Sequence, residues 1–456
     1  MIWNPAAETM DRRDLERLQL ERLRQCLAWA ETRVPFYRDR LNRARVVPEK
    51  IQRLDDLDRL PFTQKDDLRD HYPWGLFAVP LREIARVHAS SGSRGKPTVV
   101  GYTKRDLLVW REVMARALAG AGAVPGDMVQ VSYGYGLFTG GLGFHDSAEH
   151  MGLSVVPASS GNTMRQILLL QDFRPQGLAC TPSFALYIGE SMREQGLDPH
   201  SVGLRYGLFG AEPWTEAMRA QLEELWGFTA LDFYGLSEII GPGVASECVE
   251  GRPGLHVNED HFLPEIVDPD TGGRRQPGEE GELVLTSLTK EALPMLRYRT
   301  GDISRLDPTP CVCGRTTARI GRIKGRSDDM LIIKGVNVYP SQLEAALLTL
   351  EDVAPHYQLV VDRREAFPTL SVQVEPTDRV VQKWGGFDSS RPEVLTLSAR
   401  VAERIRGHLG LNPEIAIVPP KTIPRSEGKA VRVVDAGSVA DGAPPATPSN
   451  AKGERP

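Results

Sequence analysis

Polar, glycine-containing segments spread along the chain carry the residue types that bind a nucleotide. Ser90-Ser-Gly-Ser-Arg-Gly-Lys-Pro97 combines small residues, which let the backbone approach an anion, with hydroxyl donors and a lysine. A Walker A loop needs Gly-x-x-x-x-Gly-Lys followed by Ser or Thr, and this segment breaks that pattern at both ends. The segment indicates phosphate binding outside the P-loop class, with an ordinary Gly/Ser turn as the alternative. The residues expected at the phosphates are Ser90, Ser91, Gly92, Ser93, Gly95 and Lys96.

Three later segments supply the other parts of an ATP and carboxylate site. Asp232-Phe-Tyr-Gly-Leu-Ser-Glu238 offers an aromatic face for a purine, a hydroxyl for phosphate and a carboxylate for magnesium. Arg297-Tyr-Arg-Thr-Gly-Asp302 ends in a carboxylate that can accept both ribose hydroxyls. Pro424-Arg-Ser-Glu-Gly-Lys429 places a lysine in a glycine-containing loop. Each residue alone is more often solvated surface, so the prediction depends on all three together.

A glycine-rich aromatic run, Tyr133-Gly-Tyr-Gly-Leu-Phe-Thr-Gly-Gly-Leu-Gly143, is suited to hold an aromatic ring. Glycines let a ring lie against the backbone, and the aromatic side chains of Tyr135 and Phe138 can stack on it. The alternative is a core strand followed by a turn.

Cysteine usage predicts a structural metal site. Cys311-Val-Cys313-Gly forms a tight turn with two thiols, and Cys248 and His256 complete a set of four zinc ligands. Four protein ligands leave no position open for water, so the zinc would be structural. The alternative is a group of reduced, buried cysteines beside a hydrogen-bonded histidine.

Composition narrows the class of partner. The 456 residues are 41% hydrophobic and 25% charged, and the formal net charge is -5, which argues against nucleic acid as the main partner. The sequence contains no apolar run long enough to cross a membrane and no secretory signal, so we expect a cytoplasmic protein that does not bind membranes.

The periodicity predicts an α/β fold with more than one domain. An amphipathic helix is expected over residues 11–32, and short apolar strands, one of them over 206–209, alternate with helices between about residues 87 and 287. That alternation predicts a large N-terminal domain with largely parallel sheets, followed by a β-rich subdomain. A small, mobile α+β domain is expected after it. The predicted boundaries are 1–327, 328–435 and a disordered tail, 436–456.

The motifs together resemble the adenylate-forming superfamily of acyl coenzyme A synthetases, luciferase and peptide-synthetase adenylation domains. More narrowly, they resemble the phenylacetate coenzyme A ligase family. Besides the segments above, the motifs that carry this resemblance are Gly210-Ala-Glu-Pro-Trp214, Gly241-Pro-Gly-Val-Ala245, Asp260-His-Phe262, Leu288-Thr-Lys-Glu291 and Gly325-Arg-Ser-Asp-Asp-Met330.

The resemblance implies a role for each matching residue. Glu238 would bind magnesium and Lys429 would stabilise the adenylation transition state, so both are candidate catalytic residues. The nucleotide would contact Ala211, Glu212, Asp232, Phe233, Tyr234, Gly235, Ser237, Asp302 and Arg326. The aryl acid would contact Tyr135, Gly136, Phe138, Gly140, Gly141, Phe144, Gly210 and Pro213. The small domain would rotate about Asp328 and bring Lys334 and Gly335 to the acceptor.

The implied activity is ATP-dependent formation of an aryl-AMP, followed by acyl transfer to coenzyme A. A carrier-protein thiol, or an amine or hydroxyl of a second aryl acid, is the alternative acceptor, and a non-catalytic nucleotide- or aryl-binding protein is the alternative class. Arg94, Phe144 and Asp146 depart from the family pattern. His145 and Asp146 could meet a ring substituent, so a hydroxy- or amino-benzoate stands beside phenylacetate as substrate. The N-terminal helix could form the interface of a homodimer.

Overall fold

The computed structural model describes residues 1–90, 97–327, 331–333, 336–362 and 369–436. Two compact units are present. The first comprises Met1–Trp214, Arg219–Asp328 and Glu427–Lys429, and the second comprises Thr215–Met218, Asp329–Ser426 and Ala430–Pro456. Each unit has its own hydrophobic core.

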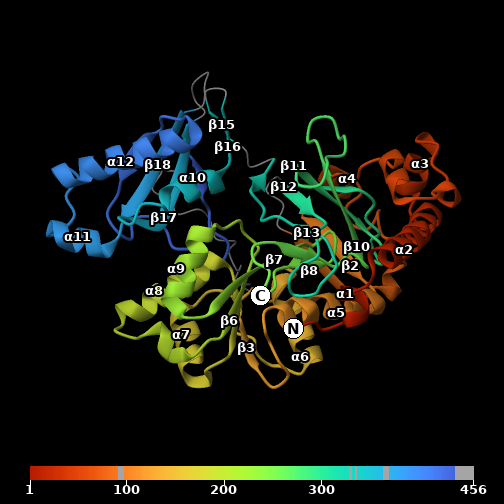
Figure 1. Ribbon diagram of the computed structural model, residues 1–456, viewed down its shortest axis with the longest axis horizontal. Helices are drawn as coiled ribbons and strands as arrows, with labels where there is room; N and C mark the ends of the chain where they lie inside the picture. Colours follow the sequence, from red (N-terminus) through yellow and green to blue (C-terminus); the bar gives the residue numbers. More distant parts are fainter. Residues whose placement is uncertain (91–96, 328–330, 334–335, 363–368, 437–456) are drawn as a thin grey trace, which may run out of the picture. The chain divides into compact units, whose positions relative to one another are not determined.

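One long mixed sheet forms the centre of the first unit (Figure 1). Its strand order is β10-β11-β12-β13-β9-β8-β7-β6-β5-β3-β4, and β14 pairs with β12. Pairing is parallel from β4 through β7 and antiparallel from β7 onwards. The strands are β3 (Met128–Val131), β4 (Ser154–Val156), β5 (Gly177–Cys180), β6 (Tyr206–Phe209), β7 (Thr229–Leu236), β8 (Gly241–Ser246), β9 (Leu255–Val257), β10 (Phe262–Val267), β11 (Glu280–Ser287), β12 (Tyr298–Asp307), β13 (Arg319–Ile320) and β14 (Gly325–Arg326).

Parallel strands need helical crossovers, and these helices cover the sheet. Helix α6 packs against β3, β4 and β8, while α7 and α8 pack together on the other side of the parallel strands (Figure 1). Strands β5 and β6 are buried along their whole length, as expected of a strand covered on both faces. The helices of this part are α5 (Lys104–Gly120), α6 (Gly140–Met151), α7 (Thr163–Phe173), α8 (Pro182–Glu194), η4 (Pro199–Val202) and α9 (Glu216–Trp226).

A helical N-terminal region precedes the sheet. Helix α2 begins after Asp11, whose carboxylate accepts a hydrogen bond from the backbone N–H of Arg13, and it buries Leu15, Leu23 and Leu27 on one face. The elements here are α1 (Pro5–Glu8), α2 (Arg12–Arg33), α3 (Pro35–Arg43), η1 (Pro48–Lys50), η2 (Leu54–Arg59), α4 (Lys65–Asp70), η3 (Leu81–Glu83) and the hairpin of β1 (Arg86–Ser90) with β2 (Thr98–Tyr102).

The second unit contains a four-stranded sheet in the order β19-β18-β17-β20 and a separate β15-β16 hairpin. Helix α12 buries Val394, Leu397, Val401 and Ile405, a spacing that places all four on one face. Its elements are β15 (Leu331–Ile333), β16 (Val336–Val338), α10 (Pro340–Leu347), β17 (Val353–Asp362), β18 (Thr369–Pro376), α11 (Asp378–Trp384), α12 (Pro392–Leu409), β19 (Glu414–Ile417) and β20 (Val433–Asp435).

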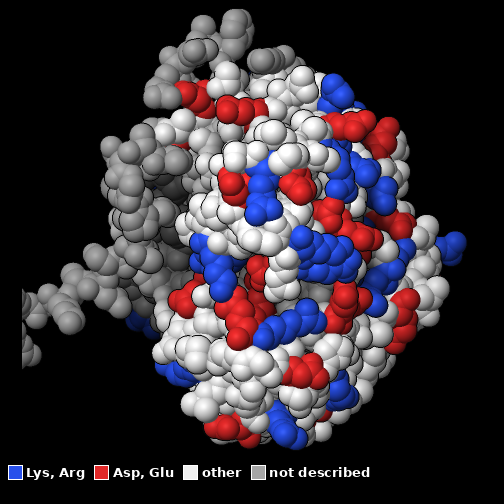
Figure 2. Space-filling view, turned by 90° about the vertical axis from the view of Figure 1, so that its left-hand side faces the viewer, with Lys and Arg blue, Asp and Glu red and all other residues white. Residues whose placement is uncertain are grey.

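The expected α/β fold class is confirmed, with one refinement. The large sheet is mixed, because the β-rich part continues the parallel strands in one sheet through β7 and β8. Within the described ranges, no helix is long and apolar enough to cross a membrane. On the face drawn in Figure 2, basic and acidic side chains are interspersed.

Candidate active site and metal centre

The end of β7 meets β12 and β14 around the carboxylate of Asp302. The hydroxyl of Tyr234 donates a hydrogen bond to Asp302 Oδ2 at 2.6 Å, and Arg326 Nη1 donates to Oδ1 at 3.1 Å. Strand pairing places Asp302 directly opposite Arg326, so the backbone register fixes this contact. Three residues predicted at the nucleotide are therefore brought together, and a charge-assisted bond orients the carboxylate.

Asp232 lies deeper on β7 and is almost completely buried. Burial raises the pKa of its carboxyl to about 7, the nearby Glu247 carboxylate acts in the same direction, and Arg322, with Nε 3.5 Å away, opposes both. Arg322 also donates to the carbonyl of Trp214 at 3.0 Å. Asp232 is thus part of a buried charge cluster that Arg322 links to the backbone of Trp214.

The loop after β6 carries four predicted site residues in a tight conformation. A Cβ on Gly210 would lie 2.6 Å from the carbonyl oxygen of Phe233, so only glycine fits there. Ala211 adopts a positive φ of 68°. Glu212, followed by Pro213, accepts a hydrogen bond from the backbone N–H of Ser183 at 2.9 Å through Oε1. Backbone strain of this kind is concentrated at functional sites.

The turn that follows β7 presents Ser237 and Glu238, both nearly fully buried. The hydroxyl of Ser237 lies 3.2 Å from that of Thr139, and Tyr298 donates to Glu238 Oε1 at 3.3 Å. A magnesium ion prefers carboxylate oxygens, so the donor type of Glu238 fits this ion. Gly235 must stay a glycine, because an added Cβ would lie 2.0 Å from the carbonyl oxygen of Gly241.

The predicted phosphate loop begins at the end of β1. Ser90 pairs with Thr98 in the β1-β2 hairpin. Its Oγ is buried and finds no hydrogen-bond partner among the described residues, which fits a hydroxyl that meets a ligand. The rest of the predicted loop, Ser91, Gly92, Ser93, Gly95 and Lys96, lies outside the described residues.

The predicted acyl slot contains a turn and the first residues of α6. Gly140 and Gly141 begin this helix, and a Cβ on Gly141 would lie 2.7 Å from the carbonyl oxygen of Gly134 and 3.0 Å from the ring of Tyr135. Phe138 is exposed, as is its neighbour Gly136. The run therefore forms a turn and a helix start, rather than the core strand that was the alternative.

Three consecutive side chains of α6, of which Phe144 and Asp146 depart from the family pattern, contact protein groups. Phe144 is fully buried and stacks on Tyr133, with ring centroids 5.5 Å apart. His145 contacts the hydroxyl of Tyr135 through Nδ1 at 3.2 Å and Glu149 through Nε2 at 3.1 Å. Asp146 forms a 2.7 Å ion pair with Arg86.

Lys429 lies in the short stretch Glu427–Lys429, which belongs to the first compact unit. The carbonyl oxygen of the preceding residue, Gly428, accepts hydrogen bonds from Thr181 Oγ1 at 2.8 Å and Ser183 Oγ at 3.3 Å. Ser183 also holds Glu212 through its backbone N–H, so the backbone beside Lys429 and the predicted adenine loop share an anchor. The predicted hinge Asp328 and acceptor residues Lys334 and Gly335 lie outside the described residues.

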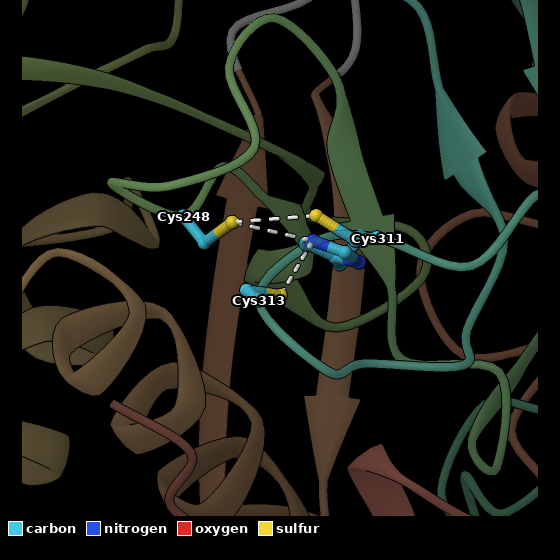
Figure 3. A group of neighbouring side chains, drawn as sticks. Cys248, Cys311 and Cys313 are labelled. Carbon is cyan, nitrogen blue, oxygen red and sulfur yellow. Dashed lines mark hydrogen bonds between the residues drawn. The ribbon is translucent and has the colours of Figure 1, made fainter.

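The four predicted zinc ligands converge (Figure 3). Cys248 follows β8, His256 lies on β9, and Cys311 and Cys313 lie on the turn after β12. Their ligand atoms all lie within 4.8 Å of one another. Cys248 Sγ lies 3.8 Å from Cys311 Sγ and 3.5 Å from His256 Nε2, and Cys313 Sγ lies 3.6 Å from the same nitrogen. A tetrahedral zinc site has sulfur–sulfur edges of about 3.8 Å and sulfur–nitrogen edges of about 3.6 Å.

Polar groups around the cluster orient its members. Thr317 Oγ1 lies 3.4 Å from His256 Nδ1, which leaves Nε2 to face the thiols. The backbone N–H of Gly251 donates to Cys248 Sγ at 3.2 Å, and Arg315 Nη1 donates to Cys313 Sγ at 3.5 Å. The donor set is chemically suited to zinc and is organised by its surroundings.

Sequence reasoning missed several residues of the site. Tyr298 contacts Glu238, and Arg322 contacts Asp232, yet tyrosines and arginines are too common to single out by type. Lys290 lies in the motif Leu288-Thr-Lys-Glu291, but the sequence did not predict a role for it. Its signal was a lysine two residues before the apolar run 292–296 that follows β11.

Comparisons with known proteins agree with this geometry. The family model described as AMP-binding enzyme matches residues 15–289, and the model of the AMP-binding enzyme C-terminal domain matches residues 335–436. The chain belongs to this family of AMP-binding, adenylate-forming enzymes.

Relatives narrow the group within the family. The chain is 53% identical to the phenylacetate-coenzyme A ligase of Thermus thermophilus over 95% of this chain and 99% of that protein. It is 48% identical to the Escherichia coli protein of the same name over 94% of this chain and 96% of that protein. Among solved structures, 2-hydroxyisobutyryl-CoA ligase in complex with 2-HIB-AMP matches with a TM-score of 0.90 and 30% identity, covering 97% of this chain and 94% of that one.

Proposed function

We infer that this protein is an ATP-dependent, AMP-forming ligase that activates an aryl carboxylic acid and transfers the acyl group to coenzyme A. The observation that carries this inference is the convergence of Tyr234 and Arg326 on the carboxylate of Asp302, within a chain that is 47–53% identical to phenylacetate-coenzyme A ligases over nearly its whole length. An oriented, nearly buried carboxylate is suited to accept the two hydroxyls of a ribose.

The acid that best fits the slot is phenylacetate-like. A hydroxy- or amino-benzoate would need a free polar partner in the wall of the slot, and His145 and Asp146 are the two residues that the sequence offered for this role. Both nitrogens of His145 contact protein groups, and Asp146 is paired with Arg86. Releasing either group to a ring substituent would cost a hydrogen bond or a partly buried ion pair. The relatives named phenylacetate-coenzyme A ligase support the same preference.

In the proposed first half-reaction, the substrate carboxylate attacks the α-phosphorus of ATP and pyrophosphate leaves. Asp302 and Arg326 hold the ribose, the loop that starts at Ser90 holds the phosphates, and Lys429 offsets the charge that develops. Magnesium, when bound at Glu238, neutralises phosphate charge. In the proposed second half-reaction, the sulfur of coenzyme A attacks the acyl carbonyl and AMP leaves.

We also propose that Cys248, His256, Cys311 and Cys313 hold a structural zinc ion. The distances above support tetrahedral coordination by these four donors. The ligands come from three separate segments, so the bound ion would cross-link the turn after β12 to β8 and β9. Elemental analysis of protein purified without chelator should give about one zinc per chain, and Cys313→Ser should lower this content. Less than about a tenth of an equivalent in the unmodified protein would end this proposal.

Pyrophosphate exchange across a panel of aryl acids tests the proposed function most directly. We expect acid-dependent exchange, strongest with phenylacetate, and a coenzyme A thioester as the product when coenzyme A is added. Exchange without thioester, but with transfer to a carrier-protein thiol or an aryl amine, would favour the alternative acceptor. ATP binding without exchange for any acid would favour the non-catalytic alternative.

A further inference from the structure

Lys290 is a lysine almost completely removed from solvent beside the turn that carries Glu238. It follows β11 in the segment Leu288–Glu291, and it is only 4% exposed. Its Nζ donates to the carbonyl oxygens of Glu238 at 3.2 Å and Ser237 at 3.5 Å. A buried ammonium costs much free energy unless its surroundings compensate it, so this position needs an explanation.

An aspartate on α5 anchors the segment that carries Lys290. The carboxylate of Asp106 accepts hydrogen bonds from the backbone N–H groups of Thr103 at 2.9 Å, Glu291 at 2.7 Å and Ala292 at 3.0 Å. Two of these donors directly follow Lys290 in sequence. Asp106 therefore fixes the backbone from which the lysine reaches the Glu238 turn, and its charge favours the ammonium form.

Tyr102 on β2 holds the same turn from the same side. Its hydroxyl donates to the carbonyl oxygens of Ser237 at 3.3 Å and Ile240 at 3.0 Å, and Lys290 Nζ lies 4.7 Å from the centre of its ring. Lys290 and Tyr102 thus bind three backbone carbonyls of one turn. Tyr298 contacts the Glu238 carboxylate itself, so the main chain and the side chain have separate supports.

We propose that Lys290 is a positioning residue for the adenylation reaction, which holds the backbone of Ser237 and Glu238 so that the hydroxyl and the carboxylate face the magnesium nucleotide. This inference rests on the proposed function, because Glu238 has a role only if ATP is the substrate. A displacement of a functional group by about 1 Å can lower a rate by about 100-fold, which sets the scale of the expected effect.

The test is a double-mutant cycle between Lys290→Met and Glu238→Gln, read by pyrophosphate exchange. Lys290→Met should lower kcat/KM for exchange by about 10- to 100-fold, but by less than about 3-fold when Glu238 is already replaced. Thioester formation from supplied acyl-AMP should stay within about 3-fold of the unmodified enzyme, because that step needs no magnesium nucleotide. Equal losses in both backgrounds would overturn the proposal.

Controls separate positioning from general loss of stability. Arg116→Met removes another nearly buried cation, paired with Asp260 at 2.7 Å, and should lower stability without changing exchange per folded molecule. Lys290→Arg keeps the charge and the N–H donors, so it should lose less exchange activity than Lys290→Met. If Lys290→Met does not fold, the same cycle is run with Lys290→Gln, which keeps a shorter N–H donor, and equal losses in both Glu238 backgrounds would again overturn the proposal. Absence of exchange in the unmodified enzyme would instead refute the proposed function.

Discussion

Replacing Asp302 by asparagine is the sharpest test of the nucleotide site. The amide is the same size as the carboxylate, so its oxygen can still accept from Arg326, while its NH₂ group can donate to the hydroxyl of Tyr234. The protein contacts are therefore largely kept. The amide nitrogen cannot accept a hydrogen bond from a ribose hydroxyl, so one charge-assisted bond to the nucleotide is lost.

The size of this effect follows from hydrogen-bond energetics. A bond to a charged group contributes about 1.5–3 kcal/mol, which corresponds to an increase of about 10- to 150-fold in the KM for ATP. The KM for the aryl acid should change by less than about 3-fold, since Asp302 lies at the predicted ribose site and the acid at the predicted slot.

Pyrophosphate exchange at varied ATP gives the measurement. Asp307→Asn serves as the matched control, because this residue lies on the same strand and contacts Thr309 and Arg319 instead of the predicted nucleotide site. A KM for ATP in the Asp302 variant that matches the control would refute the assignment of the ribose to this carboxylate.

Three further predictions address other parts of the chain. Lys429→Ala should abolish adenylate formation but leave thioester formation from supplied acyl-AMP largely intact, and unchanged pyrophosphate exchange would contradict the catalytic role. Gly141→Ala should lower kcat/KM for the aryl acid by about 10-fold, since the new Cβ would lie 2.7 Å from the carbonyl oxygen of Gly134. The control is Gly407→Ala, because a Cβ at that position meets nothing within 4 Å. Equal effects of the two substitutions on kcat/KM would argue against the predicted aryl acid slot. Burial lowers the pKa of His261 from 6.5 to about 4, despite the nearby Asp260 carboxylate. The unfolded chain therefore binds a proton that the folded chain does not, and stability should fall as the pH drops from about 6.5 towards 4. The midpoints of urea unfolding at pH 7 and pH 5 measure this loss of stability. If the midpoint of the His261→Gln variant falls by the same amount between these pH values, His261 is not the source of the loss.

Regular elements could be predicted from the sequence where their periodicity is strong. The helix expected over 11–32 is α2 (Arg12–Arg33), and the strand expected over 206–209 is β6 at the same residues, because apolar side chains recur at helical spacing in one and run continuously in the other. Strand β19 (Glu414–Ile417) was not predicted, since only its last residue is buried. Its partner β18, distant in sequence, supplies the pairing that a local pattern cannot reveal.

The candidate site shows the same division between local and distant information. Glu238 and Asp302 were predicted, because each ends a segment that, together with the others, matches the motifs of the family. The residues that support them were not predicted: Tyr298, Tyr102 and Lys290 contact Glu238 or its turn from segments 52 to 138 residues away in sequence. Such contacts depend on the order of strands in the sheet, which no single segment encodes.

Gly251 is constrained by the cluster of Cys248, His256, Cys311 and Cys313. A Cβ at this position would lie 2.1 Å from Cys311 Sγ, so any other residue would displace that thiol. Relatives that lack the cysteines are released from this constraint. Among homologues, glycine at this position should therefore be inherited together with the cysteine pair, and its replacement should mark the lineages without the proposed zinc site.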